Sequence, residues 1–444
     1  MRKTLPIAAG LIAGSLLSGA AGAATTEELA KRIQELEQTV RLLNRKQEVS
    51  EEIYVADKSR AATAGTVKAG LDGFALVSPD KQAELKLRGL LQFDGRFGLD
   101  DDKDADTFLF RRVRPTLEGK LGKAAFRFTP EFANDDADLV DGYIDWTLPA
   151  NLVLRAGQFK APVGLERLQS GSSLVFIERA FPTELAPNRD RGLALYTSLL
   201  EKRLGFEFAV TNGAPDGRDA TNADFDGEQE LNARVFFEPV PGIGFGVAGS
   251  HGEKFSKNDT RAASPNNAQA FLPRYRSPAQ TTIFNYVATA TADGDHSRIT
   301  PQAYAYAGPF GVMAEYIESA QEVALGARTE EFTNEAAQIT AVWSITGEDQ
   351  GFKGIKPTRP GGAWELALRY STLDIDDAAF DLKFADASRS VESADVWAVG
   401  LNWTITPNLK AFTNYTITQF DGGAANGGDR DDEEALFTRL HLNY

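Results

Sequence analysis

Apolar and polar residues alternate along most of the chain after residue 82. In residues 83–97, mainly leucine and phenylalanine occupy one set of alternate positions, and mainly lysine, arginine, glutamine and aspartate occupy the other. This period of two predicts β-strands that have one apolar and one polar face. The pattern fits a soluble sandwich with the apolar faces inside, and equally a membrane barrel with the apolar faces toward lipid. Other features of the chain decide between these two folds.

The same period predicts further strands, which bring the total to 16 antiparallel strands. They lie near residues 107–121, 123–132, 139–148, 151–159, 192–199, 203–212, 229–238, 242–252, 297–307, 310–322, 331–345, 361–374, 394–405, 409–420 and 434–444. An even number of strands is the rule for bacterial outer-membrane barrels. Thr281–Ala290 also resembles a strand, but we assign it to the long loop 253–296, because counting it makes the total odd; 18 strands is the fallback.

The connections between these strands are alternately short and long. The short ones lie at residues 122, 148–150, 201–202, 239–241, 308–309 and 406–408, and the intervening ones are longer and polar. Short turns on one side and long loops on the other are typical of outer-membrane barrels. The segment Thr346–Pro360 is an exception, since it is long and falls on the short side.

Both ends of the chain favour export to an outer membrane. Residues 1–23 have the form of a signal peptide, with a basic start, a short apolar run and a small-residue cleavage site. That apolar run is too short to span a bilayer, and no longer one follows it. The chain ends on Tyr444, and a final strand that ends on an aromatic residue resembles the signal read by barrel-assembly machinery. We therefore predict an all-β transmembrane barrel over residues 83–444, located in the outer membrane.

Residues 25–50 are predicted to form a helix, because apolar residues return at alternating steps of four and three. These positions are Leu29, Ile33, Leu36, Val40 and Leu43. The spacing is typical of a coiled coil. Such a short helix is marginal alone, so we expect it to associate with copies of itself; the alternative is packing on its own domain. We assign residues 24–60 to a periplasmic coiled-coil helix and linker, and residues 61–82 to a linker with a small hairpin near Val67–Val77.

Composition and charge exclude several functions. The formal net charge of -16 argues against nucleic acid as a partner. The chain has no Cys and 3 scattered His, so we expect no metal site and no cofactor. Glu166 and Glu178 both lie beside arginines, which argues against paired catalytic carboxylates, and we predict no enzymatic activity. The long loops are acidic and predict a solvated rim, with divalent-cation contact to lipopolysaccharide as a secondary interpretation.

One long insert, Gly157–Arg191, interrupts the strand pattern. We predict that residues 160–191 fold into the barrel and narrow the pore. The polar faces of the early strands are basic and carry Lys86, Arg88, Arg96, Arg112, Arg114, Arg127 and Arg155. Rings of arginine and lysine select anions, and the planar guanidinium suits oxyanions such as phosphate. The alternative is that these arginines only pair across strands with acidic neighbours.

At these pore-facing segments the chain resembles the phosphate-selective porin O and P family. The matching segments are Phe110–Val113 with Gly119, Gly157–Lys160, Gly164–Glu166, Phe176–Arg179, Gly362–Leu366 with Arg369 and Tyr370, and Gly400–Trp403. The set is fairly specific although no single segment is, and the resemblance covers roughly residues 67–444. It implies a trimeric 16-stranded barrel whose third extracellular loop folds into the pore, where arginines and lysines bind anions.

The resemblance also implies individual residues of an anion site. The family's constriction pair falls on Arg111 and Arg112, its later basic residues on Arg167 and Arg179, and an acidic residue of the site on Asp141. Lys160 in the matching segments and the lumen residues Arg88 and Arg114 complete the predicted site. Adjacent strand residues face opposite ways, so Arg111 and Arg112 reach the pore together only if a bulge or a strand end lies there.

Two departures from the family pattern concern selectivity. The fifth loop offers only Arg261, Arg274 and Arg276 where the selective members carry a dense arginine ladder, and Leu90 stands where they carry an arginine. We predict a homotrimeric outer-membrane porin that passively favours small, phosphate-like anions. The alternatives are a general diffusion porin without phosphate selectivity and a plugged barrel that tethers the envelope.

Overall fold

The computed structural model describes residues 25–71, 73–99, 106–133, 137–220, 226–256 and 269–444. The predicted signal peptide, most of the acidic run 100–106, the acidic run 134–136 and Arg261 lie outside these residues. The chain divides into two units, which meet between Ala64 and Gly65. No helix in the described ranges is long and apolar enough to cross a membrane.

Within its described residues, the first unit consists of one helix, α1 (Thr26–Thr63). It is longer than the predicted 25–50, because the next thirteen residues contain neither glycine nor proline and include alanine, glutamate and lysine, which favour helix. Every side chain of α1 that the structure describes is exposed to solvent.

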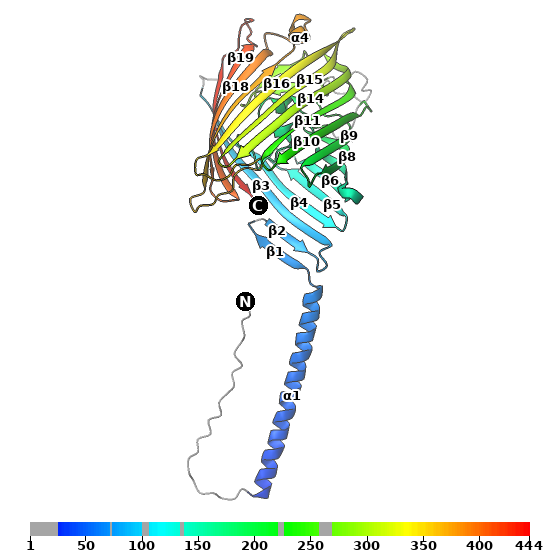
Figure 1. The fold of residues 1–444 in the computed structure, drawn as a ribbon, viewed down its shortest axis with the longest axis vertical. Helices are drawn as coiled ribbons and strands as arrows, with labels where there is room; N and C mark the ends of the chain where they lie inside the picture. The colour runs from blue at the N-terminus through cyan, green and yellow to red at the C-terminus, as the bar shows by residue number, and fades with distance from the viewer. Residues whose placement is uncertain (1–24, 72, 100–105, 134–136, 221–225, 257–268) are drawn as a thin grey trace. The chain divides into compact units, whose positions relative to one another are not determined.

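The second unit contains a closed antiparallel barrel of 16 strands, as predicted (Figure 1). The strands are β3 (Ala83–Gly98), β4 (Thr107–Leu121), β5 (Ala124–Glu131), β6 (Asp138–Thr147), β7 (Val153–Lys160), β8 (Arg189–Leu199), β9 (Leu204–Thr211), β10 (Glu230–Val240), β11 (Ile243–Phe255), β14 (Thr291–Ala307), β15 (Phe310–Leu325), β16 (Arg328–Ser344), β17 (Ala363–Asp374), β18 (Val391–Thr404), β19 (Leu409–Gly422) and β20 (Glu433–Asn443). Each strand pairs with the next along the chain, and β20 pairs with β3 to close the wall.

Thr281–Ala290 is not part of the wall. Its strand, β13 (Thr282–Asn285), pairs only with β12 (Arg274–Arg276) in a separate small sheet. The even strand number therefore holds, and the fallback of 18 is not needed. Several wall strands are longer than predicted: β14 begins at Thr291, six residues before the predicted start.

The predicted hairpin is also present. It consists of β1 (Thr66–Gly70) and β2 (Gly73–Val77), and β2 extends the sheet beside β3. The last residue, Tyr444, exchanges two backbone hydrogen bonds of 3.1 Å with Gly89 of β3, and its ring contacts Phe74 of the hairpin edge-on. Gly89 leaves room for the Tyr444 ring, since a Cβ there would lie 2.4 Å from the ring and the ring would have to shift.

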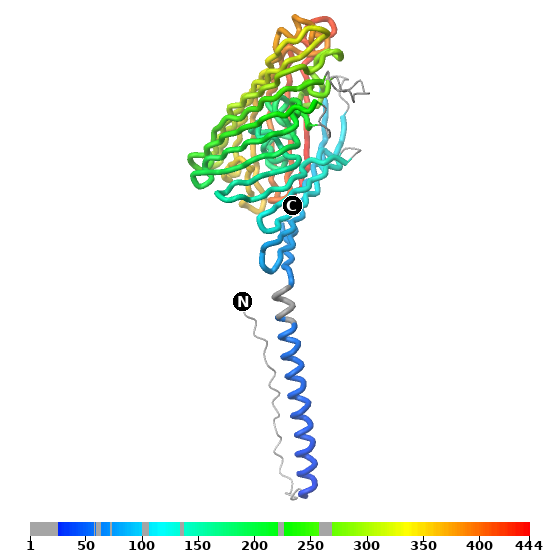
Figure 2. Tube along the Cα trace, turned by 90° about the vertical axis from the view of Figure 1, so that its right-hand side faces the viewer, coloured from blue at the N-terminus to red at the C-terminus, as the bar shows by residue number. Residues whose placement is uncertain are grey.

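The outer face of the wall is apolar, as the alternation predicts. In β18, Trp397, Val399 and Leu401 are exposed, whereas the alternate residues Ala398 and Asn402 are buried inside. Figure 2 shows the tilted strands that present this face. A transmembrane barrel needs such an apolar exterior.

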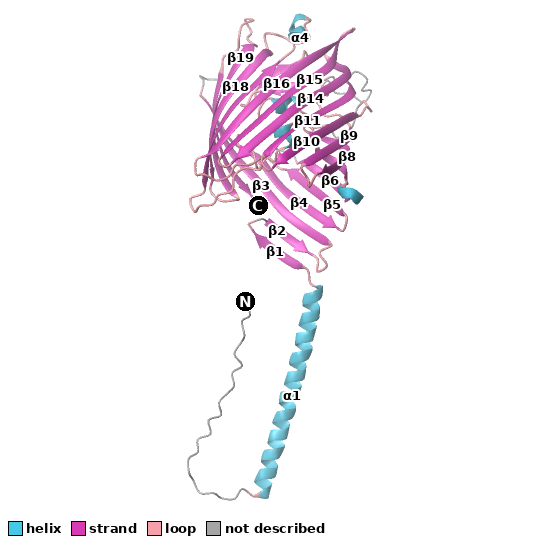
Figure 3. Ribbon diagram, viewed as in Figure 1, coloured by secondary structure: helices cyan, strands magenta, loops and turns pink. Residues whose placement is uncertain are grey.

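The barrel interior is not polar throughout. Along β14–β19 the inward side chains join one apolar core with three connections: L3 (residues 161–188), the described part of L5 (269–290) and L7 (375–390). Phe181, Tyr275, Phe284 and Phe380 are members of this core. The short helices α2 (Leu165–Leu168) and α3 (Pro182–Leu185) belong to L3, and α3 contacts β15 and β16 (Figure 3). The core fills this side of the lumen and leaves the wall around β3–β8 lined by polar side chains.

Candidate functional site

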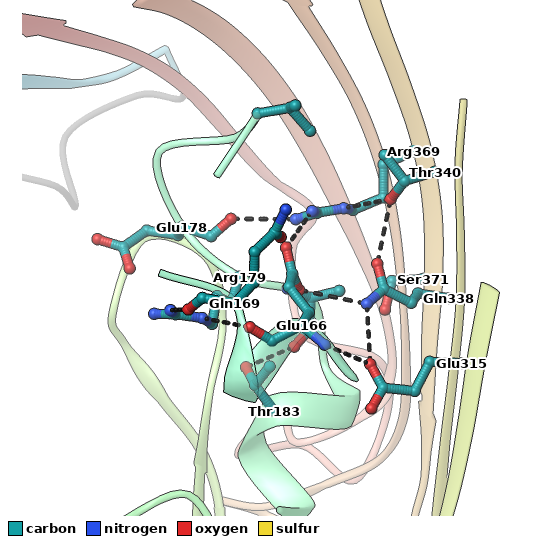
Figure 4. A network of polar contacts seen from close by, with 12 residues as sticks. Glu166, Gln169, Glu178, Arg179, Thr183, Glu315, Gln338, Thr340, Arg369 and Ser371 are labelled. Atoms are coloured by element: carbon teal, nitrogen blue, oxygen red, sulfur yellow. Dashed lines mark hydrogen bonds and ion pairs between the residues drawn. The ribbon is translucent and has the colours of Figure 1, made fainter. Parts of the chain in front are cut away.

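L3 enters the barrel where β7 ends and is fixed to the opposite wall. Gly164, with φ of 85°, provides the turn before α2. The backbone N–H groups of Leu165 and Glu166 donate to the carboxylate of Glu315 on β15. The Glu166 carboxylate accepts from Arg369 on β17 and from the Ala180 N–H, 2.8 Å away (Figure 4).

The middle of L3 is attached to strands on the other side of the barrel. The Ile177 N–H donates to Asn414 of β19 over 2.7 Å, and Arg439 of β20 donates to the Ile177 carbonyl over 3.1 Å. Gln92 of β3 donates to the Gly171 carbonyl over 3.0 Å. L3 therefore crosses the lumen and is held at several points by buried hydrogen bonds, which are costly to break.

The long turn between β16 and β17, T6 (residues 345–362), supports L3 from the side of the short turns. Gln169 of L3 donates to the Phe352 carbonyl over 2.6 Å, and the Phe352 ring stacks on Tyr304 of β14. The contacts explain why this turn is long: it contacts the infolded loop instead of only joining two strands.

Two cavities lie on either side of L3 along the β3–β8 wall. The loop-side cavity has a volume of about 600 Å³ and reaches the loop ends of the strands, with Arg96, Arg112 and Arg179 in its lining. The turn-side cavity has a volume of about 420 Å³ and reaches the opposite strand ends, with Arg88, Arg127 and Tyr444 in its lining.

The two cavities share four lining residues, and three of these are cationic. The shared residues are Arg114, Lys160, Gly171 and Arg189. Three cations therefore lie at the junction: Arg114 and Arg189 pair with Glu131 and Asp141, whereas Lys160 has no carboxylate partner within the described chain. Cationic constrictions of this kind favour anions.

The loop-side cavity is strongly cationic. Its lining contains ten arginine and lysine side chains: Arg96, Arg111, Arg112, Arg114, Lys160, Arg167, Arg179, Arg189, Arg276 and Arg369. It contains five carboxylates: Glu131, Asp138, Glu178, Glu184 and Asp219. The lining thus has an excess of five positive charges, although the whole chain has a formal net charge of -16.

A β-bulge lets Arg111 and Arg112 both point inward. The register between β3 and β4 shifts here: Gln92 is opposite Arg112, but the next residue, Phe93, is opposite Phe110. Arg111 is therefore the extra residue, and its side chain donates to Glu178 of L3 over 2.9 Å. Arg112 donates to Gln92 on the inner face. A bulge is one of the two arrangements, a bulge or a strand end, that allow adjacent side chains to reach the pore together.

Several predicted site residues are neutralised by carboxylates. Arg88 lies 3.0 Å from Glu118, Arg114 pairs with Glu131, and Arg111 shares Glu178 with Arg96. Asp141 accepts from Arg189 over 3.0 Å. Cross-strand pairing, the alternative interpretation of the basic faces, therefore accounts for part of them.

Four predicted residues differ, since no carboxylate of the described chain lies within ion-pair distance of them. Arg112 contacts an amide oxygen, and the other three donate only to backbone carbonyls: Lys160 to Arg167 and Gln169, Arg167 to Thr183, and Arg179 to Glu166 and Gln169. Arg112 and Arg167 are only 4% and 7% exposed. Buried cations without counter-ions are costly, and all four line the loop-side cavity. We call Arg112, Lys160, Arg167 and Arg179 the unpaired cluster.

The pKa values within L3 follow from this crowding. Burial, with Arg167 nearby, lowers the pKa of Arg179 to about 9. Although burial alone raises it, Arg111 and Arg96 hold the pKa of Glu178 well below its ordinary value. Burial raises the pKa of Glu184 to about 6 despite the opposing effect of Arg167. Among these groups, Glu184 is the one that titrates near neutral pH.

Three cations of the cavity were not among the predicted site residues. Arg189 begins β8, Arg369 faces inward on β17, and Arg276 lies in L5. Alternation along residues 361–374 places Arg369 on the inner face and so signals its orientation, and Arg276 was named among the arginines of the fifth loop but not assigned to the site. Within the described ranges, no group of three or more His, Asp or Glu side chains is placed to hold a metal ion.

The chain matches known protein sequences over most of its length. The family model described as phosphate-selective porin O and P matches residues 85–444. Porin O of Pseudomonas aeruginosa is 25% identical to the chain over 86% of this chain and 95% of that protein.

Solved structures of outer-membrane proteins share this fold. The channel DcaP of Acinetobacter baumannii matches with a TM-score of 0.54 at 11% identity, covering 82% of this chain and 97% of that chain. OmpT of Vibrio cholerae in its trimer form matches with a TM-score of 0.52 at 9% identity, covering 82% and 99%. At these identities the likeness establishes the fold alone.

Proposed function

The chain belongs to the phosphate-selective porin O and P family and is an outer-membrane porin, and from this premise we propose that its pore favours small anions, phosphate-like oxyanions above all. Passage is passive, without cofactor or chemical turnover. The observation that carries the proposal is the unpaired cluster, because four cations without carboxylate partners within the described chain surround one cavity. An entering anion would supply the missing counter-charge.

The path of the anion follows the wall from β3 to β8. It enters the loop-side cavity, crosses the junction at Arg114, Lys160 and Arg189, and leaves through the turn-side cavity. L3 narrows this path, and Asp141 holds Arg189 in place and moderates the positive charge. Binding must remain weak enough for release, and several sites in series meet this need better than one deep site.

The partners follow from the location of the barrel. We propose that the chain forms a homotrimer, which is the form named for the structurally similar OmpT of Vibrio cholerae. The apolar outer wall contacts lipid, and the acidic loops contact lipopolysaccharide through divalent cations. The final strand with Tyr444 is the segment that we expect the barrel-assembly machinery to bind.

Phosphate competition in planar bilayers tests the proposal. We expect the purified protein to conduct chloride, and millimolar phosphate to reduce that chloride current at constant ionic strength, since phosphate occupies the unpaired cluster. Sulfate at the same concentration tests whether the effect extends to oxyanions in general. A chloride current that phosphate does not reduce would identify a general diffusion porin. A barrel that carries no current would identify a plugged, envelope-tethering protein.

A further inference from the structure

Helix α1 carries an apolar stripe that no other described element of its own unit covers. Leu29, Ile33, Leu36, Val40 and Leu43 form this stripe, and each is between 50% and 64% exposed. A surface helix normally buries such a stripe. The helix spans 38 residues and its unit contains no other described element against which the stripe packs.

The spacing of the stripe specifies a coiled-coil seam. Ile33 and Val40 fall on the first core position of successive heptads, and Leu29, Leu36 and Leu43 on the second. Beyond Leu43 the next two seam positions are polar, Gln47 and Ser50. The apolar seam therefore covers residues 29–43, a little over two heptads.

The charges that flank the seam specify the partner and its direction. In a parallel, in-register coiled coil, each residue before a first core position faces the residue five places further along the partner helix. This rule places Arg32 against Glu37 and Lys46 against Glu51. In an antiparallel arrangement the basic residues would instead face basic residues, and the acidic ones acidic residues. Within the described chain, Arg32, Glu37 and Lys46 have no ion pair that would compete.

We propose that residues 29–43 of α1 pack against the same residues of other copies of this chain, as a parallel, in-register coiled coil. Two heptads are marginal in isolation. The barrels compensate for this: each helix is covalently continuous with a membrane-embedded barrel, so neighbouring barrels raise the effective concentration of the helices. β-branched residues at the first core position with leucine at the second favour two strands in free peptides. A barrel trimer would impose three, and the copy number is an outcome of the test.

Engineered cysteines in the full-length protein in outer membranes test the packing, because the natural chain has no Cys. L29C is expected to form a disulfide with L29C of another copy under mild oxidation, since a parallel seam places these residues side by side. R41C, on the outer side of the helix, is the matched control and should cross-link about fivefold more slowly. In an antiparallel pair, second core positions face first core positions, so Leu29 would lie against Val40 or Gln47 of the other copy; absence of L29C cross-linking therefore overturns the proposal.

Charge exchange tests the specificity of the pairing. In the L29C background, Glu37→Arg should slow cross-linking about threefold, and Arg32→Glu combined with Glu37→Arg should restore it. Equal rates in all three proteins would overturn the charge argument. A cross-linked product of a mass that does not correspond to copies of this chain would show that another protein covers the stripe. Unchanged chloride conductance in each variant shows that the barrel itself is folded.

Discussion

The unpaired cluster differs from the other basic residues of the lumen in what its cations contact. Arg155, for example, makes two hydrogen bonds with Asp145, at 2.7 and 2.9 Å, and stacks on Tyr143. Arg179 and Lys160 instead donate to backbone carbonyls of L3, which orient their side chains without cancelling their charge. Dipoles that orient a cation leave its field available to a passing anion. Alternation identified which residues face inward, but not which of them have a carboxylate partner, because pairing depends on neighbours distant in sequence.

Glu184 gives the pore a pH dependence. Its pKa is raised to about 6, so the side chain is a carboxylate at pH 7.5 and neutral at pH 5. Protonation removes one negative charge from the lining of the loop-side cavity. We expect the ratio of chloride to potassium permeability to rise roughly twofold between pH 7.5 and pH 5, measured from zero-current potentials.

Two variants isolate this effect. Glu184→Gln should show the higher ratio of chloride to potassium permeability at both pH values. It should therefore lose the change in this ratio between pH 7.5 and pH 5, which we call the pH step. Glu228→Gln, an exposed carboxylate of the β9–β10 connection outside the cavity, should keep the step. A pH step that persists in Glu184→Gln would assign the titration to another group.

At the scale of elements, L3 depends on a few buried anchors. Glu315 receives the N–H groups of Leu165 and Glu166, and Gln338 donates to the carboxylates of both Glu315 and Glu166. Hydrogen bonds to a charged group contribute about 1.5–3 kcal/mol each, and removing the acceptor leaves buried donors unsatisfied. The attachment of L3 near α2 therefore rests mainly on Glu315 and Arg369.

Glu315→Ala is expected to release this end of L3. Single-channel recordings should show a larger mean conductance and flickering between levels, because the loop no longer holds one position. Thermal unfolding should occur at a lower temperature, corresponding to a loss of about 3 kcal/mol. Glu318→Ala, on the same strand but facing outward, is the control and should conduct like the natural protein. Steady, unaltered conductance in Glu315→Ala would show that L3 is held by its other contacts.

The elements that the sequence predicted well are those with a periodic pattern. The wall strands were found because lipid contact on one face and water on the other impose a period of two over at least eight residues. The apolar core of L3, L5 and L7 was missed for the opposite reason. Phe271 and Tyr275 lie where this connection has no regular period, and Phe284 lies in the strand-like stretch Thr281–Ala290 that was assigned to the loop; only the fold shows that all three are buried. The long T6 turn was recognised as an exception, but its contact with Gln169 was not predictable.

At the scale of the whole molecule, the cations are concentrated around the loop-side cavity although the chain as a whole is acidic. The chain has a formal net charge of -16, yet the loop-side cavity has twice as many cations as carboxylates. Low-dielectric walls focus the field of these cations along the pore. Net charge alone would suggest a protein that repels anions; the placement of the charges predicts the reverse.

The zero-current potential in a KCl gradient tests this claim most directly. The natural protein should give a potential of the sign expected when chloride is more permeable than potassium. Arg112→Gln, Arg167→Gln and Arg179→Gln combined should bring that potential at least about halfway to zero, since three of the four unpaired cations are removed. The matched control combines Lys81→Gln, Lys123→Gln and Lys202→Gln, three exposed cations outside both cavities, and should leave the potential nearly unchanged. A folded, conducting triple variant with the potential of the natural protein would contradict the account.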